Sequence, residues 1–163
     1  MSPVVTSPAR VREDLIGLVH RGPDVREFAL RAVRILVRAV RFEGVFVATM
    51  DPATLMPTGT MAAENVPPPA THPRLKEIEF GGEDFNALPS LALSERHAAT
   101  LSQATGGVLD RSERHREIMG PHGFGDELRA VRVDDHATWG AVSFLRGADR
   151  APSRPPTRRS WKR

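Results

Sequence analysis

The segment DELRAVRVDDHATWGAVSFLR, residues 126–146, decides the fold. It contains two runs rich in Val, Leu and aromatic residues, which are separated by the polar residues 134–136, and apolar side chains alternate along each run. In the first run, Val131 and Val133 then share one face. The pattern predicts an antiparallel β-hairpin over residues 126–146. Because an isolated hairpin is at best marginally stable in water, we expect the helical segments before it to cover it.

Two helices are predicted at the start of the chain. Ser7 can cap a helix that has Pro8 at its first position, and apolar residues at helical spacing follow it until Gly22. A second helix is predicted over residues 24–41, with apolar side chains on one face and a stripe of arginines on the other. We interpret that stripe as a solvent-exposed helix face, and a docking surface for an acidic partner is the alternative.

The centre of the chain combines strands with an irregular region. Residues 44–50 form a short, continuous apolar run that is typical of a central strand, and residues 57–62 are a weaker candidate for the returning strand. The prolines within residues 64–74 predict a loop. Further short elements are expected as an edge strand at residues 76–80, helical turns at residues 84–88 and 91–97, and a short helix that ends at Met119. This order of elements predicts an α+β fold in which helices cover one face of an antiparallel sheet.

The basic residues are unevenly distributed along the chain. The net charge is +3, but residues 151–163 hold five of the 23 basic residues and no acidic residue. Residues 1–150 therefore keep 18 basic residues against 20 acidic ones, a net charge of −2. The body of the chain thus gives no electrostatic reason to expect binding to DNA or RNA.

Composition also bounds the class of protein. A chain of 163 residues suits a single domain with a genuine core. The absence of Cys excludes a disulfide framework, a thiolate metal site and a Cys nucleophile. No apolar run approaches the ~20 residues of a membrane span, and the N-terminus lacks the charged and apolar regions of a signal peptide. We therefore expect a cytoplasmic protein without a membrane partner.

Motifs of catalysis and of metal binding are missing from the sequence. There is no Gly-x-Ser-x-Gly elbow and no His-Glu-x-x-His arrangement, and Gly106-Gly107 is not followed by the Lys-Ser/Thr of a phosphate loop. His115 and His122, with Glu113 or Glu117 nearby, could be imagined as metal ligands, but they lack the usual ligand spacing. We expect no enzyme activity, no metal and no cofactor.

Several short segments follow one another in a recognisable order. They are residues 51–54 (DPAT), 83–88 (EDFNAL), 112–117 (SERHRE), 123–129 (GFGDELR) and 139–140 (WG). Together they resemble the N-terminal sensor region of a group of actinobacterial-type LuxR-family transcriptional regulators. The most specific part is Glu-Leu-Arg at residues 127–129, followed by Trp-Gly and a closing Arg146. The resemblance covers about residues 11–150.

This resemblance implies a GAF-type domain, with a GAF/PAS-like antiparallel sheet that is flanked by helices. It implies a non-catalytic sensory module that binds a small-molecule effector, packs as a homodimer and controls a C-terminal DNA-binding helix-turn-helix. The sequence APSRPPTRRSWKR, residues 151–163, departs from the family at the point where an amphipathic helix should lead into that helix-turn-helix. Its prolines and its lack of apolar periodicity argue against a stable helix.

We hypothesise that the chain is a truncated or frame-shifted regulator, and we do not expect it to bind DNA through a helix-turn-helix. The expected organisation is a loose leader (residues 1–7), a GAF-like sensor domain (8–150) and a basic disordered tail (151–163). Loss of the final helix would expose Val33, Leu36 and Val40 and favour self-association. An alternative function is weak binding of the basic tail to nucleic acid or to an anionic surface.

The effector pocket is expected between the sheet and the irregular middle of the chain, lined mainly by apolar groups with a few polar contacts. For each apolar candidate, simple core packing is the alternative, and Trp139 in particular is expected to fill the core beside Gly140. Arg129 could instead pair with Glu127 or Asp126. The candidate ligand-binding residues are Phe46, Phe85, Leu101, His122, Phe124, Leu128, Arg129 and Trp139.

Overall fold

The computed structural model describes residues 6–148. Its helices and strands alternate in short blocks, as the sequence predicts for an α+β fold. The main elements are α1 (Pro8–His20), α2 (Val25–Leu36), β1 (Gly44–Asp51), β2 (Met56–Glu64), α3 (His72–Gly81), α4 (Leu88–Leu93), β3 (Ala98–Thr100), α5 (Leu101–Thr105), β4 (Phe124–Asp134) and β5 (Ala137–Gly147). A π-helix, His115–Met119, and short 3-10 turns fill the segment before β4.

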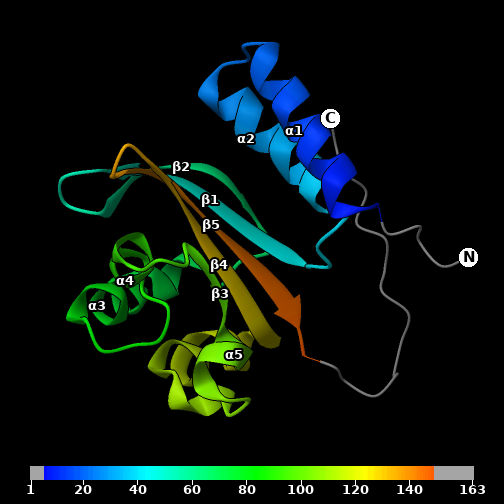
Figure 1. Cartoon of the computed structure of the whole chain (residues 1–163). Coiled ribbons are helices and arrows are strands. Elements are labelled where there is room, and N and C mark those ends of the chain that lie inside the picture. The colour runs from blue at the N-terminus through cyan, green and yellow to red at the C-terminus, as the bar shows by residue number, and fades with distance from the viewer. Residues whose placement is uncertain (1–5, 149–163) are drawn as a thin grey trace, which may run out of the picture.

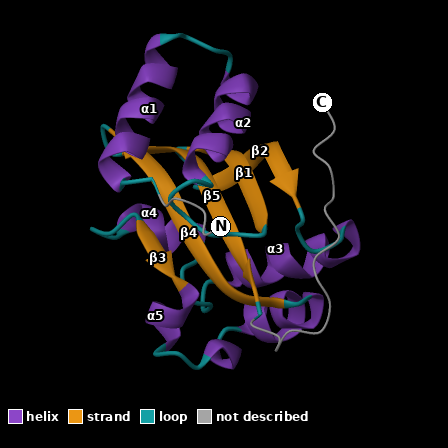
Figure 2. Cartoon of the chain, turned by 90° about the vertical axis from the view of Figure 1, so that its right-hand side faces the viewer, coloured by secondary structure: helices purple, strands orange, loops and turns teal. Residues whose placement is uncertain are grey.

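The strands form one five-stranded antiparallel sheet in the order β2-β1-β5-β4-β3. The pair α1 and α2 lies over one face, and α3 and α4 lie over the opposite face (Figures 1 and 2). The sheet flanked by helices confirms the predicted fold class and is consistent with a GAF/PAS-like fold. The expectation that helices cover one face is wrong. Apolar side chains of β1, β4 and β5 project from both faces of the sheet, and each face has its own apolar cluster.

The predicted terminal hairpin is present as β4 and β5. The turn between them places Asp135 and His136 at φ values of 46° and 65°, which is the left-handed region that both central residues of a type I′ hairpin turn require. The first strand pairs next to this hairpin, with Val45 opposite Phe144 and Val47 opposite Val142. The 126–146 segment therefore supplies the central strand of the sheet, β5, and one of its two inner neighbours, β4.

The N-terminal helices begin where the sequence predicts. The Ser7 hydroxyl accepts a hydrogen bond from Arg10 N (3.3 Å), and the Asp24 carboxylate accepts one from Glu27 N (2.8 Å). Both bonds satisfy backbone N–H groups that a helix start leaves free. α2 ends at Leu36, earlier than the predicted residue 41, and turns carry the chain onward to β1.

Two apolar clusters attach the helices to the sheet. Over one face, Val33 of α2 packs with Val45 and Phe144, and Leu36, Val40 and Leu128 lie against this cluster. Over the other face, Leu88 and Leu91 of α4 pack on strand residues from β1, β4 and β5. The expectation that Val33 would be exposed is wrong, since 5% of its surface is accessible; Leu36 and Val40 are half-buried.

Two local predictions fail in the irregular middle. Residues 76–80 belong to helix α3 rather than to an edge strand, although Ile78 alternates with charged neighbours. Their neighbours along the chain decide this: Pro73 suits the first turn of a helix, and Gly82, at φ 87°, ends it. The edges of the sheet are β2 and β3, and the sequence did not predict β3, which pairs with β4. The predictions on residues 1–5 and 149–163, including the disordered tail, lie outside the described residues.

Candidate functional site

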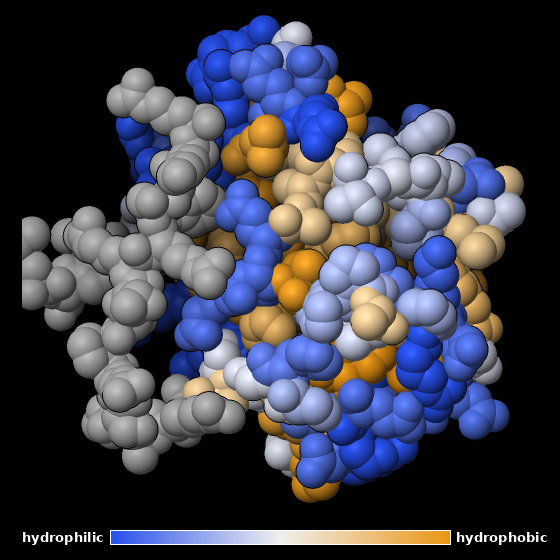
Figure 3. All heavy atoms as spheres, turned by 180° about the vertical axis from the view of Figure 1, so that it is seen from behind, coloured by the Kyte–Doolittle hydropathy of each residue, from blue (hydrophilic) through white to orange (hydrophobic). Residues whose placement is uncertain are grey.

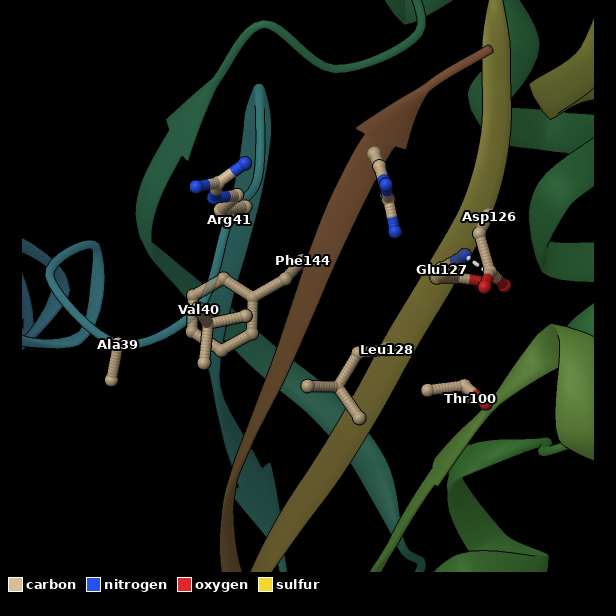
Figure 4. Close-up of a pocket in the computed structure, with 9 residues that line it drawn as sticks. Ala39, Val40, Arg41, Thr100, Asp126, Glu127, Leu128 and Phe144 are labelled. Atoms are coloured by element: carbon tan, nitrogen blue, oxygen red, sulfur yellow. Dashed lines mark hydrogen bonds between the residues drawn. The ribbon is translucent and has the colours of Figure 1, made fainter. Parts of the chain in front are cut away.

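A groove of about 290 Å³ lies on the sheet face that α1 and α2 cover, beyond the end of α2. Strands β4 and β5 form its floor, the chain after α2 forms one wall, and Thr100 of β3 stands on the opposite side (Figure 4). The lining residues are Ala39, Val40, Arg41, Thr100, Asp126, Glu127, Leu128, Phe144 and Arg146. In the space-filling view, hydrophobic surface shows between the helices at the top and the rest of the molecule (Figure 3).

The floor of the groove is apolar because of strand register. Leu128 lies directly opposite Phe144 on β5 and opposite Thr100 on β3, so these residues form a row across the sheet. Val40 stands beside the Phe144 ring (Figure 4), and Phe42 packs against that ring with centroids 4.5 Å apart. Leu128 remains half-buried and in contact with the open groove.

Polar groups line the ends of the groove. Asp126 and Arg146 form the next facing pair along β4 and β5, and both also line an adjoining hollow of about 210 Å³. The Asp126 carboxylate accepts hydrogen bonds from Ser102 N (3.0 Å), Ser102 Oγ (2.7 Å) and Glu127 N (2.8 Å). Its charge is therefore committed to local donors.

The two arginines of the groove differ from Asp126 in this respect. Arg41 and Arg146 are both exposed, and neither has a carboxylate oxygen of residues 6–148 within 4.0 Å. Their guanidinium groups therefore retain free donors toward the groove. A guanidinium presents these donors in a planar fork that matches a carboxylate or a phosphate.

Directly behind the groove, on the opposite face of β4, lies a chain of buried charges, which we call the buried network: Glu79, Asp84, Arg114, Glu127 and Arg129. Glu127 is at its centre. Arg114 Nε donates to Glu127 Oε2 (3.0 Å), and Arg129 Nε donates to Glu127 Oε1 (2.9 Å). The outer ends are Arg114 Nη1 on Asp84 Oδ2 (2.8 Å) and Arg129 Nη1 on Glu79 Oε2 (2.6 Å).

Backbone groups complete the buried network. Arg114 also donates to Phe85 O (3.1 Å), Arg129 donates to Asn86 O (3.2 Å), and Asp84 accepts from the backbone of Glu113 and Arg114. These bonds connect α3, the loop of residues 84–86 and the segment before the π-helix to β4. Because its charges are paired and hydrogen-bonded, the buried network stabilises the arrangement of these segments and offers no free group for chemistry.

Electrostatics holds the central members of the buried network in their charged forms. Burial opposes ionisation of Glu127, but the charges of Arg114 and Arg129 outweigh it and lower the pKa of Glu127 to about 2. Burial likewise disfavours the charged form of Arg129, and Glu127 and Glu79 reverse the effect and raise the pKa of its guanidinium. Both residues are therefore ionised at neutral pH.

The alternation of β4 links the buried network to the groove. Asp126 and Leu128 point to the groove face, whereas Glu127 and Arg129 point to the buried network. The buried charges of Glu127 and Arg129 thus lie on the same strand as the groove residues Asp126 and Leu128.

The predicted ligand-binding residues do not meet in one cavity. Only Leu128 lines the groove. Arg129 belongs to the buried network, where it pairs with Glu127 as the alternative interpretation expected. Leu101 and Phe124 are buried, Phe46 and Phe85 are half-buried, and His122 is exposed. The expectation that Trp139 fills the core is wrong: 56% of its surface is accessible, because it follows the hairpin turn at the rim of the sheet.

The histidines considered as metal ligands have other surroundings. His115 Nδ1 lies 3.0 Å from Asp110 Oδ1, and its Nε2 is buried without a hydrogen-bond partner among the described residues. His122 Nδ1 lies 2.7 Å from Ile118 O. Within residues 6–148 no three His, Asp or Glu side chains are arranged to hold a metal ion.

Sequence reasoning missed most of the groove and of the buried network. In the sequence, Arg146 serves only as part of the resemblance to the LuxR-family sensor region. Arg41 is only one member of the arginine stripe that is interpreted as a solvent-exposed helix face. The alternation of β4 could have placed Asp126 and Leu128 on one face, and the register of the hairpin adds Arg146 opposite Asp126. No local pattern pairs Glu79 or Asp84 with arginines 50 and 30 residues away along the chain.

Comparison with known proteins yields no identification. No family model, no curated protein and no solved structure matches the chain. In the part of the chain that the structure describes, no helix is both long enough and apolar enough to span a bilayer. The function must therefore be argued from the groove and the fold alone.

Proposed function

We propose that this chain is a non-catalytic, cytoplasmic sensory and dimerisation module of GAF type. It resembles the N-terminal sensor region of a LuxR-family transcriptional regulator. The observation that carries the proposal is the groove on β4 and β5, which combines an open apolar floor with two arginines that have free donors. Such a combination of apolar surface and a few oriented polar groups is typical of small-molecule sites.

The fold supports the proposal in a second way. The groove contacts the turns that follow α2 through Ala39 and Val40, and α2 is one half of the helix pair that covers this face of the sheet. A ligand in the groove would therefore touch both the sheet and the segment that connects it to the helix pair. Binding of this kind can shift the position of one layer relative to the other, provided that the ligand has different affinities for the two arrangements.

Dimerisation is proposed to use the helix pair. Several large apolar side chains on α1 and α2 are exposed: Ile16, Val19, Val25 and Leu30, with Val37 directly after α2. Exposed apolar side chains that gather on one helical unit are typical of an interaction surface. The partner in this proposal is a second copy of the chain.

Thermal unfolding with a metabolite library tests the sensory function. A compound that binds only the folded state at 100 times its dissociation constant stabilises by about 2.7 kcal/mol, which for a domain of this size raises Tm by roughly 5–10 °C. We expect at least one class of small metabolite to produce such a shift. A library in which no compound of any charge class changes Tm would overturn the sensory function.

A further inference from the structure

We propose that the effector of the groove is a small amphipathic monoanion, an organic carboxylate whose apolar part lies on Leu128 and Phe144 and whose charged end is bound by Arg41 and Arg146. This inference rests on the proposed sensory function, because it names the chemical class of the effector. Its first basis is charge. Asp126, whose side chain faces the groove, accepts hydrogen bonds from Ser102 but keeps its charge, and together with Arg41 and Arg146 it leaves a net charge of +1 that favours an anion with a single charge.

The shape of the groove limits the size of the effector. A volume of about 290 Å³ lies at the lower end of the range of small-molecule pockets. Since one water occupies about 30 Å³ of liquid, the groove holds the volume of roughly ten waters. A ligand with on the order of ten non-hydrogen atoms, such as a phenyl-substituted or short-chain acid, fits this volume. Nucleotides and long acyl chains exceed it.

The floor explains why an inorganic anion is not the expected effector. Val40, Leu128 and the Phe144 ring offer apolar surface between the arginine side and Thr100 (Figure 4). A phosphate or sulfate would use the guanidinium groups and leave this surface in contact with water. An organic acid gains both the ionic hydrogen bonds and the burial of apolar area.

Charge also separates the proposed effector from other occupants of the groove. The chain's own residues 151–163 contain five basic residues and no acidic one, so they meet Arg41 and Arg146 with like charge. A second copy of the chain could cover the same apolar floor. In that case the groove would be occupied at high protein concentration and small acids would not bind.

The test uses the full chain and the probe 4-phenylbutanoate, with the neutral isostere 4-phenylbutanamide as the ligand control. Binding is measured by isothermal titration calorimetry and located by chemical-shift changes in ¹H–¹⁵N spectra. We expect the acid to bind at least tenfold more tightly than the amide, because the neutral amide can accept hydrogen bonds from the guanidinium groups but carries no negative charge to pair with them. The shift changes should cluster at residues 39–41, 126–128 and 144–146.

Matched arginine variants identify the residues that bind the charge. Arg41→Gln and Arg146→Gln should each weaken binding of the acid by about tenfold and leave binding of the amide unchanged. The control is Arg132→Gln, since Arg132 is an exposed arginine on β4, the strand next to that of Arg146, but pairs with Asp134 (3.3 Å) outside the groove. This control should bind the acid as the unaltered chain does, and all three variants should keep the Tm of the unaltered chain.

The outcomes separate the inference from the proposed function. Equal affinities for acid and amide, or a loss in Arg132→Gln equal to that in Arg146→Gln, would overturn the monoanion inference. So would shift changes confined to other surfaces, or an acid that binds only after dilution dissociates a dimer. If the acid fails while another metabolite class raises Tm, the inference is wrong and the sensory function stands. If no compound of any class binds, both fail.

Discussion

Arg114 and Glu127 form an ion pair at 3.0 Å in which both side chains are almost completely buried, although they come from different elements. Arg114 precedes the π-helix, and Glu127 lies on the inner strand β4. Because Glu127 also binds Arg129, a single carboxylate connects both guanidinium groups of the buried network. Removal of this carboxylate would leave two buried cations with one remaining carboxylate partner each.

Glu127→Gln should therefore destabilise the domain strongly. The substitution keeps the shape of the side chain but removes the charge that Arg114 and Arg129 share, and loss of one partner from a buried pair typically costs about 3–5 kcal/mol. Urea unfolding measures the effect. The matched control is Glu113→Gln, since Glu113 is a surface carboxylate that pairs with Arg74 and should contribute less than about 1 kcal/mol. Equal losses in the two variants would contradict a structural role for the buried network.

Acid should destabilise the protein over a definite pH range. The pKa of Glu127 falls from 4.5 to about 2 on folding, so its contribution to stability is complete above pH 4.5 and is lost as the pH falls toward 2. Linkage between these two values corresponds to about 3 kcal/mol. Urea unfolding at intervals between pH 6 and pH 2 should show this decline. In Glu127→Gln the decline should be smaller, and an unchanged pH profile would show that other carboxylates cause it.

Trp139 should report on solvent rather than on the core. With 56% of its surface accessible, Trp139→Ser should change the free energy of unfolding by no more than about 0.5 kcal/mol. In a Trp161→Phe background, acrylamide should quench its fluorescence efficiently in the native state. The aromatic control is Phe144→Ala, because Phe144 is buried at 5% and its truncation should cost about 3–5 kcal/mol. A large loss of unfolding free energy in Trp139→Ser would mean that Trp139 is buried in the core after all.

Sequence patterns predicted the parts of the fold that depend on local chemistry. The cap at Ser7, the start of the second helix at residue 24 and the hairpin of residues 126–146 were correct, because each rests on contacts within a few residues. The prediction of an edge strand at residues 76–80 is wrong. The alternation of Ile78 and Phe80 with charged residues suits a strand, whereas Gly82 and the burial of Glu79 favour a helix. A buried glutamate has no local signature when its arginine partner is 50 residues away along the chain.

The same distinction explains the prediction of the site. Leu128 lines the groove, but this groove lies on the sheet face that α1 and α2 cover and not between the sheet and the irregular middle, where the effector pocket is predicted. Arg41 and Arg146 meet only through the pairing of β1 with β5, which joins Gly44 to Leu145. This register brings the chain after α2 beside the end of β5, and nothing in either segment alone predicts it. The prediction that Trp139 fills the core is wrong for a related reason, since the exposure of its side chain depends on its position beside the turn.

Self-association should depend on the helix pair. Sedimentation velocity should show a dimer, and Leu30→Glu or Ile16→Glu should shift the population to monomer, because each places a charge on an exposed apolar position of α2 or α1. The control is Val108→Glu, since Val108 is an exposed apolar residue (58%) that lies between α5 and the π-helix, outside the helix pair. All three variants should melt as the unaltered chain does. If Val108→Glu alone disrupted the dimer, the interface would lie on the side of the molecule that carries Val108 and not on the helix pair.

Gly44→Ala should destabilise the start of the sheet. A Cβ atom at residue 44 would lie 2.1 Å from the carbonyl oxygen of Asn65, and this oxygen belongs to backbone that cannot rotate away. Asn65 is itself fixed, because its side-chain Nδ2 donates to Glu43 O (2.9 Å). The strand pair β1–β2 must therefore shift, at a cost of about 1–3 kcal/mol.

In Gly140→Ala the new Cβ would meet its nearest atom, Ala48 O, at 3.5 Å, which is an ordinary contact, so the free energy of unfolding should change by no more than about 0.5 kcal/mol. Urea unfolding of both variants measures the difference, and equal stabilities would mean that the Asn65 segment yields without cost. Because the same β1 strand sets the register with β5, Gly44→Ala should also weaken binding of 4-phenylbutanoate in the groove, whereas Gly140→Ala should not.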